Sequence, residues 1–165
     1  MKKWLYTISF SLVLTISTNI QAVDKIAIIN IAQIFQKLPA REVAAKQLEN
    51  EFKGYATNLK SMEKKLRNDI EKLQRDRSIM KTSDINNMEK NIMEQRETFS
   101  NKAQIFEMDN HRRQTEERNK ILRRIQDAVK IVAMKKNYDI VIDTSTVVYA
   151  LPSKNITADV LKEVK

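Results

Sequence analysis

The chain of 165 residues contains one glycine, two prolines and no cysteine, and only 6% of its residues are aromatic. Glycine makes up about 7% of an average protein. Its near absence disfavours β-sandwiches and β-barrels built from tight hairpins within one chain, which need glycine at positive φ. Glycine-rich phosphate-binding loops are excluded because they need several glycines. The absence of cysteine excludes disulfide frameworks, thiol nucleophiles and cysteine zinc sites.

Residues that carry out catalysis are equally scarce. The single histidine, His111, disfavours a histidine metal site or a Ser-His-Asp triad. Asp139 and Asp143 flank a short apolar run, and we interpret them as carboxylates at the edge of a strand. We therefore predict that the chain is not an enzyme and that it uses no cofactor or metal ion.

The first 22 residues have the pattern of a secretory signal peptide. Two lysines precede an apolar, uncharged run at 5–16, and Ile20 and Ala22 suit positions −3 and −1 of a cleavage site. The apolar run is shorter than the ~20 residues that a membrane-spanning helix needs. An uncleaved membrane anchor is the alternative. We predict cleavage after Ala22 and an exported mature chain of residues 23–165.

The central part of the chain has the composition of long helices. No proline lies between Pro39 and Pro152, and no glycine follows Gly54. The stretch is rich in Glu, Lys, Arg, Gln, Leu and Met, which favour helices. Its apolar residues recur in steps of three and four, which is the heptad pattern of a coiled coil; they are Leu48, Phe52, Tyr55, Leu59, Met62, Leu66 and Leu73.

A polar break at 81–84 separates two such helices. Thr82 or Ser83 can cap a new helix there, and Asp84 suits its positive end. We predict an antiparallel helical hairpin with helices at about 39–80 and 84–136. We call residues 39–136 the arm, with its tip at about 81–84. At 1.5 Å per residue the arm is roughly 60–75 Å long.

The two ends of the chain predict a small α/β body. Apolar, β-branched runs at 25–31, 138–143 and 147–151 predict strands, and Thr157 can cap a short terminal helix. The fold class is therefore α+β and mostly α, with the hairpin inserted into a β-rich body of residues 23–38 and 137–165. About 45 residues form only a marginal core, and the sheet edges would be open. We expect several copies to close the body as a homo-oligomer.

The excess positive charge lies on the arm. Residues 40–136 contain 23 Lys and Arg against 16 Asp and Glu. We predict that the arm attracts an anionic partner, the alternative being an ordinary solvated helix face. Residues 107–120 contain one apolar residue, and i,i+4 pairs such as Asp109–Arg113 can keep them helical.

Several segments, in order, resemble the Skp (OmpH) family of periplasmic chaperones: the signal, DKIAIINIAQIFQ, LENEF, QRETFSNKAQIFEMDNHRR, EERNK and the terminal NITADVLKEVK. The similarity runs along the whole chain, except that the arm tip at 75–87 departs from the family. The resemblance implies a periplasmic homotrimer with a barrel-like body and helical arms around a cavity. It implies an ATP-independent holdase that keeps unfolded outer-membrane β-barrel proteins soluble for membrane insertion.

The resemblance also implies binding of lipopolysaccharide, or an anionic membrane surface, through the second helix of the arm. The matching residues are Lys102, Gln104, Arg112 and Arg113. Arginine can hold a phosphate through two nitrogen atoms, with lysine as a point charge. Lys102 and Arg113 are eleven residues apart, about three helical turns, and so lie on nearly the same face. A solvated helix face is the alternative here as well.

Two other function classes fit parts of the pattern. A basic helical chain with pI ≈ 9.7 is typical of nucleic-acid-binding proteins. The export signal and the near balance of charges on the arm argue against it, so no specific nucleic-acid partner is predicted. A structural coiled coil of the cell envelope would need an unbroken apolar seam, which residues 107–120 interrupt.

Overall fold

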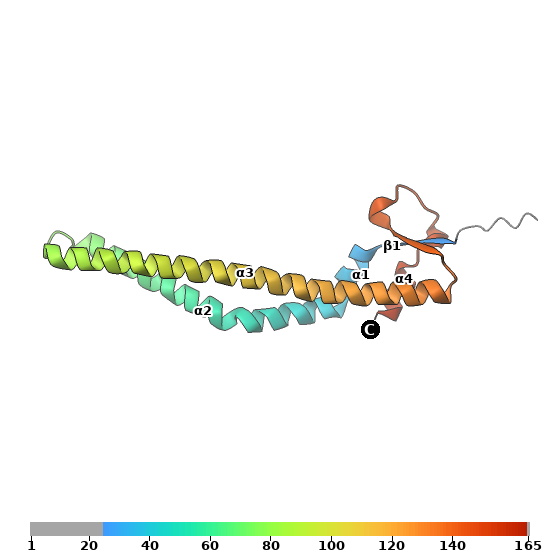
Figure 1. The fold of residues 1–165 in the computed structure, drawn as a ribbon, viewed down its shortest axis with the longest axis horizontal. Helices are drawn as coiled ribbons and strands as arrows, with labels where there is room; N and C mark the ends of the chain where they lie inside the picture. The colour runs from blue at the N-terminus through green and yellow to red at the C-terminus, as the bar shows by residue number, and fades with distance from the viewer. Residues whose placement is uncertain (1–24, 165) are drawn as a thin grey trace, which may run out of the picture.

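The computed structural model describes residues 25–164, and the predicted signal peptide at 1–22 lies outside them. Two long helices extend away from a small body that holds the other elements (Figure 1). This confirms the predicted fold class. The elements in chain order are β1 (Ile26–Ile29), α1 (Ile31–Lys37), α2 (Pro39–Asp76), α3 (Thr82–Lys135), β2 (Ile140–Asp143), the 3₁₀ turns Thr144–Thr146 and Pro152–Lys154, and α4 (Thr157–Glu163).

The body contains a two-stranded parallel sheet. β1 pairs with β2 in a register that runs from Ile26 opposite Ile140 to Ile29 opposite Asp143. On its other side, Ile28 forms a single parallel bridge with Asn155. A parallel pair needs a long crossover connection, and the arm is that connection.

The core of the body is shared with the root of α3. Ten buried hydrophobic side chains form one cluster, and four of them belong to α3. Helix α3 is therefore fixed at its C-terminal end by the body, while α2 begins at Pro39 with no side-chain cap. The ten are Ala27, Ile29, Ile34, Leu38, Ile121, Ile125, Ala128, Val132, Ile156 and Val160.

Hydrogen bonds to side chains join the strands to the short helices. Asp143 accepts the backbone N–H of Ile31 at 3.2 Å and of Ser145 at 2.7 Å. Asp139 accepts the backbone N–H of Lys25 at 3.0 Å. These contacts give both carboxylates a structural role, in agreement with the interpretation of these residues as strand-edge carboxylates.

The predicted strand at 147–151 is wrong. The segment runs between the two 3₁₀ turns, and Val148 and Tyr149 are strongly exposed. Among the described residues the run pairs with neither strand: β1 has β2 on one side and Asn155 on the other, and the outer edge of β2 stays unpaired. Strand formation depends on packing and cross-strand neighbours and not on an apolar, β-branched run alone.

Thr157 does not cap α4 but is its first residue. Its hydroxyl oxygen instead accepts the N–H of Asn30 at 2.9 Å, and the Asn155 side chain accepts the N–H of Thr157 at 2.9 Å.

The turn of the hairpin comes slightly earlier than the sequence predicts. α2 ends at Asp76, and residues 77–81 lead to α3, whose N-cap is Lys81 without a side-chain cap. The N–H of Ile79 bonds to the carbonyl of Asp76, and the Ile79 side chain is 85% exposed. No apolar partner therefore extends α2 to residue 80. Among the described residues, no helix combines the length and apolar character needed to cross a membrane.

Candidate functional site

The arm is loosely packed along its middle. Between the body core and the tip region, the described residues bury no hydrophobic side chain; the next ones are Leu73 and Ile92. Apart from Leu73, the predicted heptad positions are only half-buried or exposed, and these include Phe52 and Tyr55, which contact α3. Two helices alone cover each other on one side. The arm therefore leaves apolar groups accessible along its length.

Three aromatic rings form the main apolar contact of this middle section. Phe106 of α3 meets Phe52 of α2 edge-to-face, with ring centroids 5.7 Å apart and planes at 87°. On its other side it stacks on Tyr55, at 5.6 Å and 16°. We call Phe52, Tyr55 and Phe106 the aromatic cluster. Both geometries are favourable for aromatic pairs.

An ion cluster lies next to the aromatic cluster. Arg113 of α3 bonds to Glu51 of α2 through two nitrogen atoms, Nε to Oε1 at 2.9 Å and Nη2 to Oε2 at 3.0 Å. Its Nη1 bonds to Glu116 at 2.7 Å, and Nη2 lies 3.2 Å from Glu117. Arg112 bonds to the other oxygen of Glu116 at 2.8 Å. We call these five residues the arm ion cluster.

The electrostatics of this cluster are strongly coupled. Hydrogen bonds with Arg113 lower the pKa of Glu51 and Glu116, with Arg112 adding to the effect at Glu116. The pKa of Glu117 is lowered, first by its hydrogen bond to Lys120. The same carboxylates raise the pKa of Arg113. All five residues are therefore charged at neutral pH.

The structure separates the four predicted anion-binding residues by helix face. Lys102 and Gln104 are both exposed on α3, but two residues correspond to about 200° of rotation, so they point to opposite sides. Arg112 is exposed and paired with Asp109 at 3.3 Å as well as with Glu116. Arg113 faces α2, and only 16% of its side chain is exposed.

The predicted i,i+4 pair Asp109–Arg113 is not formed, since Arg113 turns toward α2 and Asp109 binds Arg112.

Sequence reasoning missed Glu51, although a signal for it exists. The residue numbers of the interhelical pairs Asp69–Gln95 and Glu51–Arg113 each add up to 164. A hairpin folded at the predicted break at 81–84 has nearly this register. A search for acidic and basic residues whose numbers add up to this value would have placed Glu51 opposite Arg113.

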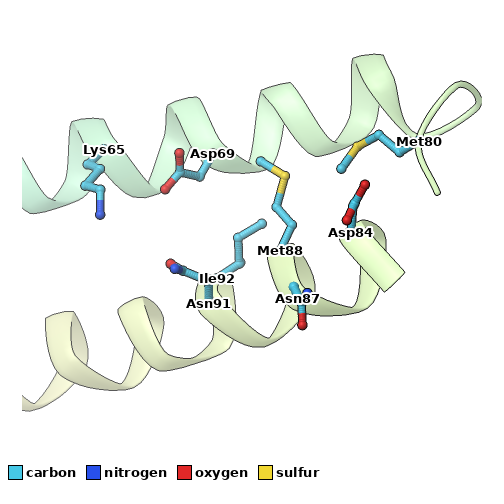
Figure 2. Close-up of a pocket in the computed structure, with 8 residues that line it drawn as sticks. All are labelled: Lys65, Asp69, Met80, Asp84, Asn87, Met88, Asn91 and Ile92. Atoms are coloured by element: carbon cyan, nitrogen blue, oxygen red, sulfur yellow. The ribbon is translucent and has the colours of Figure 1, made fainter. Parts of the chain in front are cut away.

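The tip contains a polar hollow between the helices. Figure 2 shows Asp69 of α2, with Met88 and Ile92 of α3, pointing into the space between them. The hollow has a volume of about 360 Å³, and Asp69 accepts a hydrogen bond from Gln95 at 2.8 Å beside it. Its lining residues are Lys65, Asp69, Met80, Asp84, Asn87, Met88, Asn91 and Ile92.

A second groove near the tip is more apolar. It has a volume of about 520 Å³, contains Ile70, Leu73 and Met93, and is bordered by Arg77 and Arg96. The Met93 side chain is 70% exposed. Methionine adapts to differently shaped partners because its side chain is flexible and polarizable. The tip therefore offers adaptable apolar surface next to positive charge.

Comparison with known proteins identifies the family. A family model described as "Outer membrane protein (OmpH-like)" matches residues 25–164. The chain belongs to this OmpH-like family.

Its relatives include proteins named "Chaperone protein Skp". Those from Pectobacterium atrosepticum and Yersinia pestis are 62% and 64% identical over 165 residues, which is all of both chains in each case. The one from Salmonella typhimurium is 48% identical over 166 residues, again covering both chains fully.

A crystal structure described as an OmpH-like outer membrane chaperone from Caulobacter crescentus has a similar fold. The TM-score is 0.74, and the match covers 87% of this chain and 85% of the other. The sequence identity is 12%, so this comparison supports the architecture of the OmpH-like fold and nothing finer.

Proposed function

We propose that this chain is an ATP-independent periplasmic holdase chaperone for unfolded outer-membrane β-barrel proteins. In this proposal residues 23–38 and 137–165 form the body of a homotrimer, and the arms of residues 39–136 surround a cavity that holds the client. Export follows cleavage of the signal peptide after Ala22. The family and the full-length relatives named as chaperones support this function.

The observation that carries the proposal is the open packing of the arm. A two-helix arm whose middle section buries no hydrophobic side chain presents half-buried apolar groups to any chain beside it. An unfolded client can exchange contacts among them because none requires a particular sequence. Residues 40–136 contain 23 basic and 16 acidic residues, and this excess of positive charge attracts acidic clients over distance.

Exposed apolar side chains on the body support assembly with other copies. Val148 is fully exposed and Tyr149 is 78% exposed, with Ile140 and Leu151 nearby in the body also exposed. Apolar surface of this kind on a small body is typical of an interface. In the proposal these residues lie between subunits of the trimer, and no specific nucleic acid takes part.

We further propose that the arm binds the phosphates of lipopolysaccharide or of an anionic membrane surface. Arg112 and Arg113 carry planar guanidinium groups that can bind a phosphate through two nitrogen atoms, and Lys102 and Gln104 lie about two to three turns away on the same helix. The arm ion cluster opposes phosphate binding at Arg113, because three carboxylates already pair with this side chain.

The holdase function is tested by diluting a urea-unfolded outer-membrane β-barrel into buffer with the mature protein. Turbidity and the size of the soluble product are followed together. We expect suppressed aggregation with one client per trimer. Unchanged aggregation in the presence of an intact trimer would contradict the proposal.

The anion-binding role is tested with a double variant and a matched control. Arg112→Ala with Arg113→Ala should weaken binding of lipopolysaccharide more than Lys154→Ala with Lys162→Ala, which removes the same charge from the body. Equal losses would mean that total charge, not this part of α3, determines binding.

A further inference from the structure

All three nitrogen atoms of the Arg113 guanidinium group donate hydrogen bonds within the arm. Its Nε and Nη2 atoms hold the two oxygens of Glu51 at 2.9 and 3.0 Å, and Nη1 holds Glu116 at 2.7 Å. A phosphate that binds arginine through two nitrogen atoms needs the same N–H groups. Phosphate and Glu51 therefore compete for the same atoms.

We propose that Glu51 is an intramolecular competitor of phosphate at Arg113, so that binding of a phosphate-bearing ligand releases α2 from α3 in the middle of the arm. The proposal rests on the anion-binding role proposed above and adds its regulation.

Glu51 is the carboxylate of the cluster that can leave. Glu116 and Glu117 lie on α3 itself, three and four residues from Arg113, and they are also held by Arg112 and Lys120. Glu51 lies on α2, and its side chain is 40% exposed. Among the described residues its one ion pair is with Arg113. When Glu51 leaves, the arginine and the other two carboxylates stay together on one helix.

The release has a structural consequence because little else joins the helices at this level. Arg113–Glu51 is the one ion pair between α2 and α3 within residues 25–164. The neighbouring contact is the aromatic cluster, and the hydrophobic side chains around it are not buried. Loss of the ion pair loosens the section that covers Phe52, Tyr55 and Phe106. Those rings are apolar surface that an unfolded client can contact.

The two effects are linked in both directions. If phosphate weakens the Glu51–Arg113 contact by some factor, the contact weakens phosphate binding by the same factor. Removing the charge of Glu51 should therefore increase affinity for phosphate. Couplings of this kind are typically about fivefold or more. A purely structural Glu51 would change stability and leave affinity as it is.

The test uses the full mature chain and inorganic pyrophosphate in isothermal titration calorimetry. Glu51→Gln keeps the size of the side chain and removes its charge. Glu49→Gln, two residues away on the exposed face of α2, removes the same charge outside the cluster and is the matched control. We expect Glu51→Gln to bind pyrophosphate at least about fivefold more tightly than Glu49→Gln. Glu51→Asp, which keeps the charge on a shorter side chain, should give an intermediate affinity.

A distance measurement tests the opening itself. The chain has no cysteine, so Lys53→Cys and His111→Cys, both at exposed positions on facing helices, can carry spin labels without other changes. Pyrophosphate should lengthen or broaden the distance distribution in the otherwise unchanged chain. Glu51→Gln should show the broad distribution without ligand, and Glu49→Gln should not.

The outcomes separate this proposal from the one on which it depends. If Arg112→Ala with Arg113→Ala abolishes binding while Glu51→Gln and Glu49→Gln bind equally, the anion site stands and the competitor role is overturned. If the double arginine variant binds pyrophosphate normally, both the anion-binding role and the competitor role of Glu51 are overturned. Repeating the titration with lipopolysaccharide and with phosphatidylglycerol vesicles identifies the source of the phosphate, since the effect of Glu51→Gln should be larger for the ligand that reaches Arg113.

Discussion

Phe106 lies between Phe52 and Tyr55, with one ring edge-on at 5.7 Å and the other stacked at 5.6 Å, so that a single side chain of α3 joins two positions of α2 one turn apart. In an arm without a continuous buried seam, this arrangement concentrates the apolar contact of the middle section in one residue. Contact between the helices should therefore be unusually sensitive to substitution there.

Phe106→Ala should destabilise the middle of the arm by about 2 kcal/mol, since each aromatic pair contributes about 0.5–1.5 kcal/mol beyond its buried area. Hydrogen exchange of the backbone amides near residues 52 and 106 should accelerate, while exchange in the body stays unchanged. Ile105→Ala is the matched control, because Ile105 is next to Phe106 in the sequence and its side chain is exposed. Equal exchange in the two variants would show that the aromatic cluster does not hold the helices together.

Ile34→Ala should unfold the body at a lower temperature. Ile34 lies on α1, which contacts α3 and α4, and it is fully buried in the core. Such truncations cost about 2–5 kcal/mol. Ile79→Ala, at the exposed tip, should change the free energy of unfolding by less than about 0.5 kcal/mol. Thermal denaturation followed by circular dichroism measures both. If Ile79→Ala lowers the unfolding temperature as much as Ile34→Ala, the Ile79 side chain is buried by a contact in solution.

The contact between the helices at the arm ion cluster should weaken in acid. The pKa values of Glu51, Glu116 and Glu117 lie below the ordinary value of 4.5. A lowered carboxyl pKa contributes stability that is fully present above the unfolded value and is lost as pH falls through the folded one. We expect the spin-label distance between positions 53 and 111 to broaden as pH falls below about 4.5.

Glu51→Gln should already be broad at neutral pH and change little on acidification. Far-UV circular dichroism at each pH shows whether the helices persist. A wild-type distance that is constant down to pH 3 would contradict the role of the cluster.

Tyr149→Glu should separate the subunits of the proposed trimer. Tyr149 is 78% exposed on one copy, and a carboxylate placed in an interface must be removed from water without a partner. Ser153→Glu, an exposed position in the same part of the body, is the control. Light scattering at micromolar concentration should give a trimer for the control and smaller species for Tyr149→Glu. A trimer in both would place the interface elsewhere.

Capture of clients should be slower at high salt. The basic surplus of the arm acts over distance, and the Debye length falls from about 10 Å at 0.1 M salt to about 3 Å at 1 M. Stopped-flow mixing with a labelled unfolded outer-membrane protein measures the rate. A rate that does not depend on salt would leave apolar contact as the whole cause of capture.

The hairpin could be predicted because its signals are local. The lack of proline between Pro39 and Pro152 and the heptad steps on the first helix each depend on neighbours along the chain. The strand predicted at 147–151 could not be judged in this way, since its formation depends on pairing with a segment that is distant in the sequence. Arg113 was predicted as a ligand for phosphate, but the carboxylate of Glu51 that binds it in the structure comes from a position 62 residues away.

The insertion of the arm between β1 and β2 determines the order in which the molecule can fold. Ile26 pairs with Ile140, so the sheet joins residues 114 positions apart, and every residue of the arm lies between them. In the export proposed above, which proceeds from the N-terminus, β1 has no partner until the entire hairpin has crossed the membrane. Sheets built from such distant segments form slowly. Closure of the helical hairpin then favours pairing, because it brings the two strands to the same end of the arm.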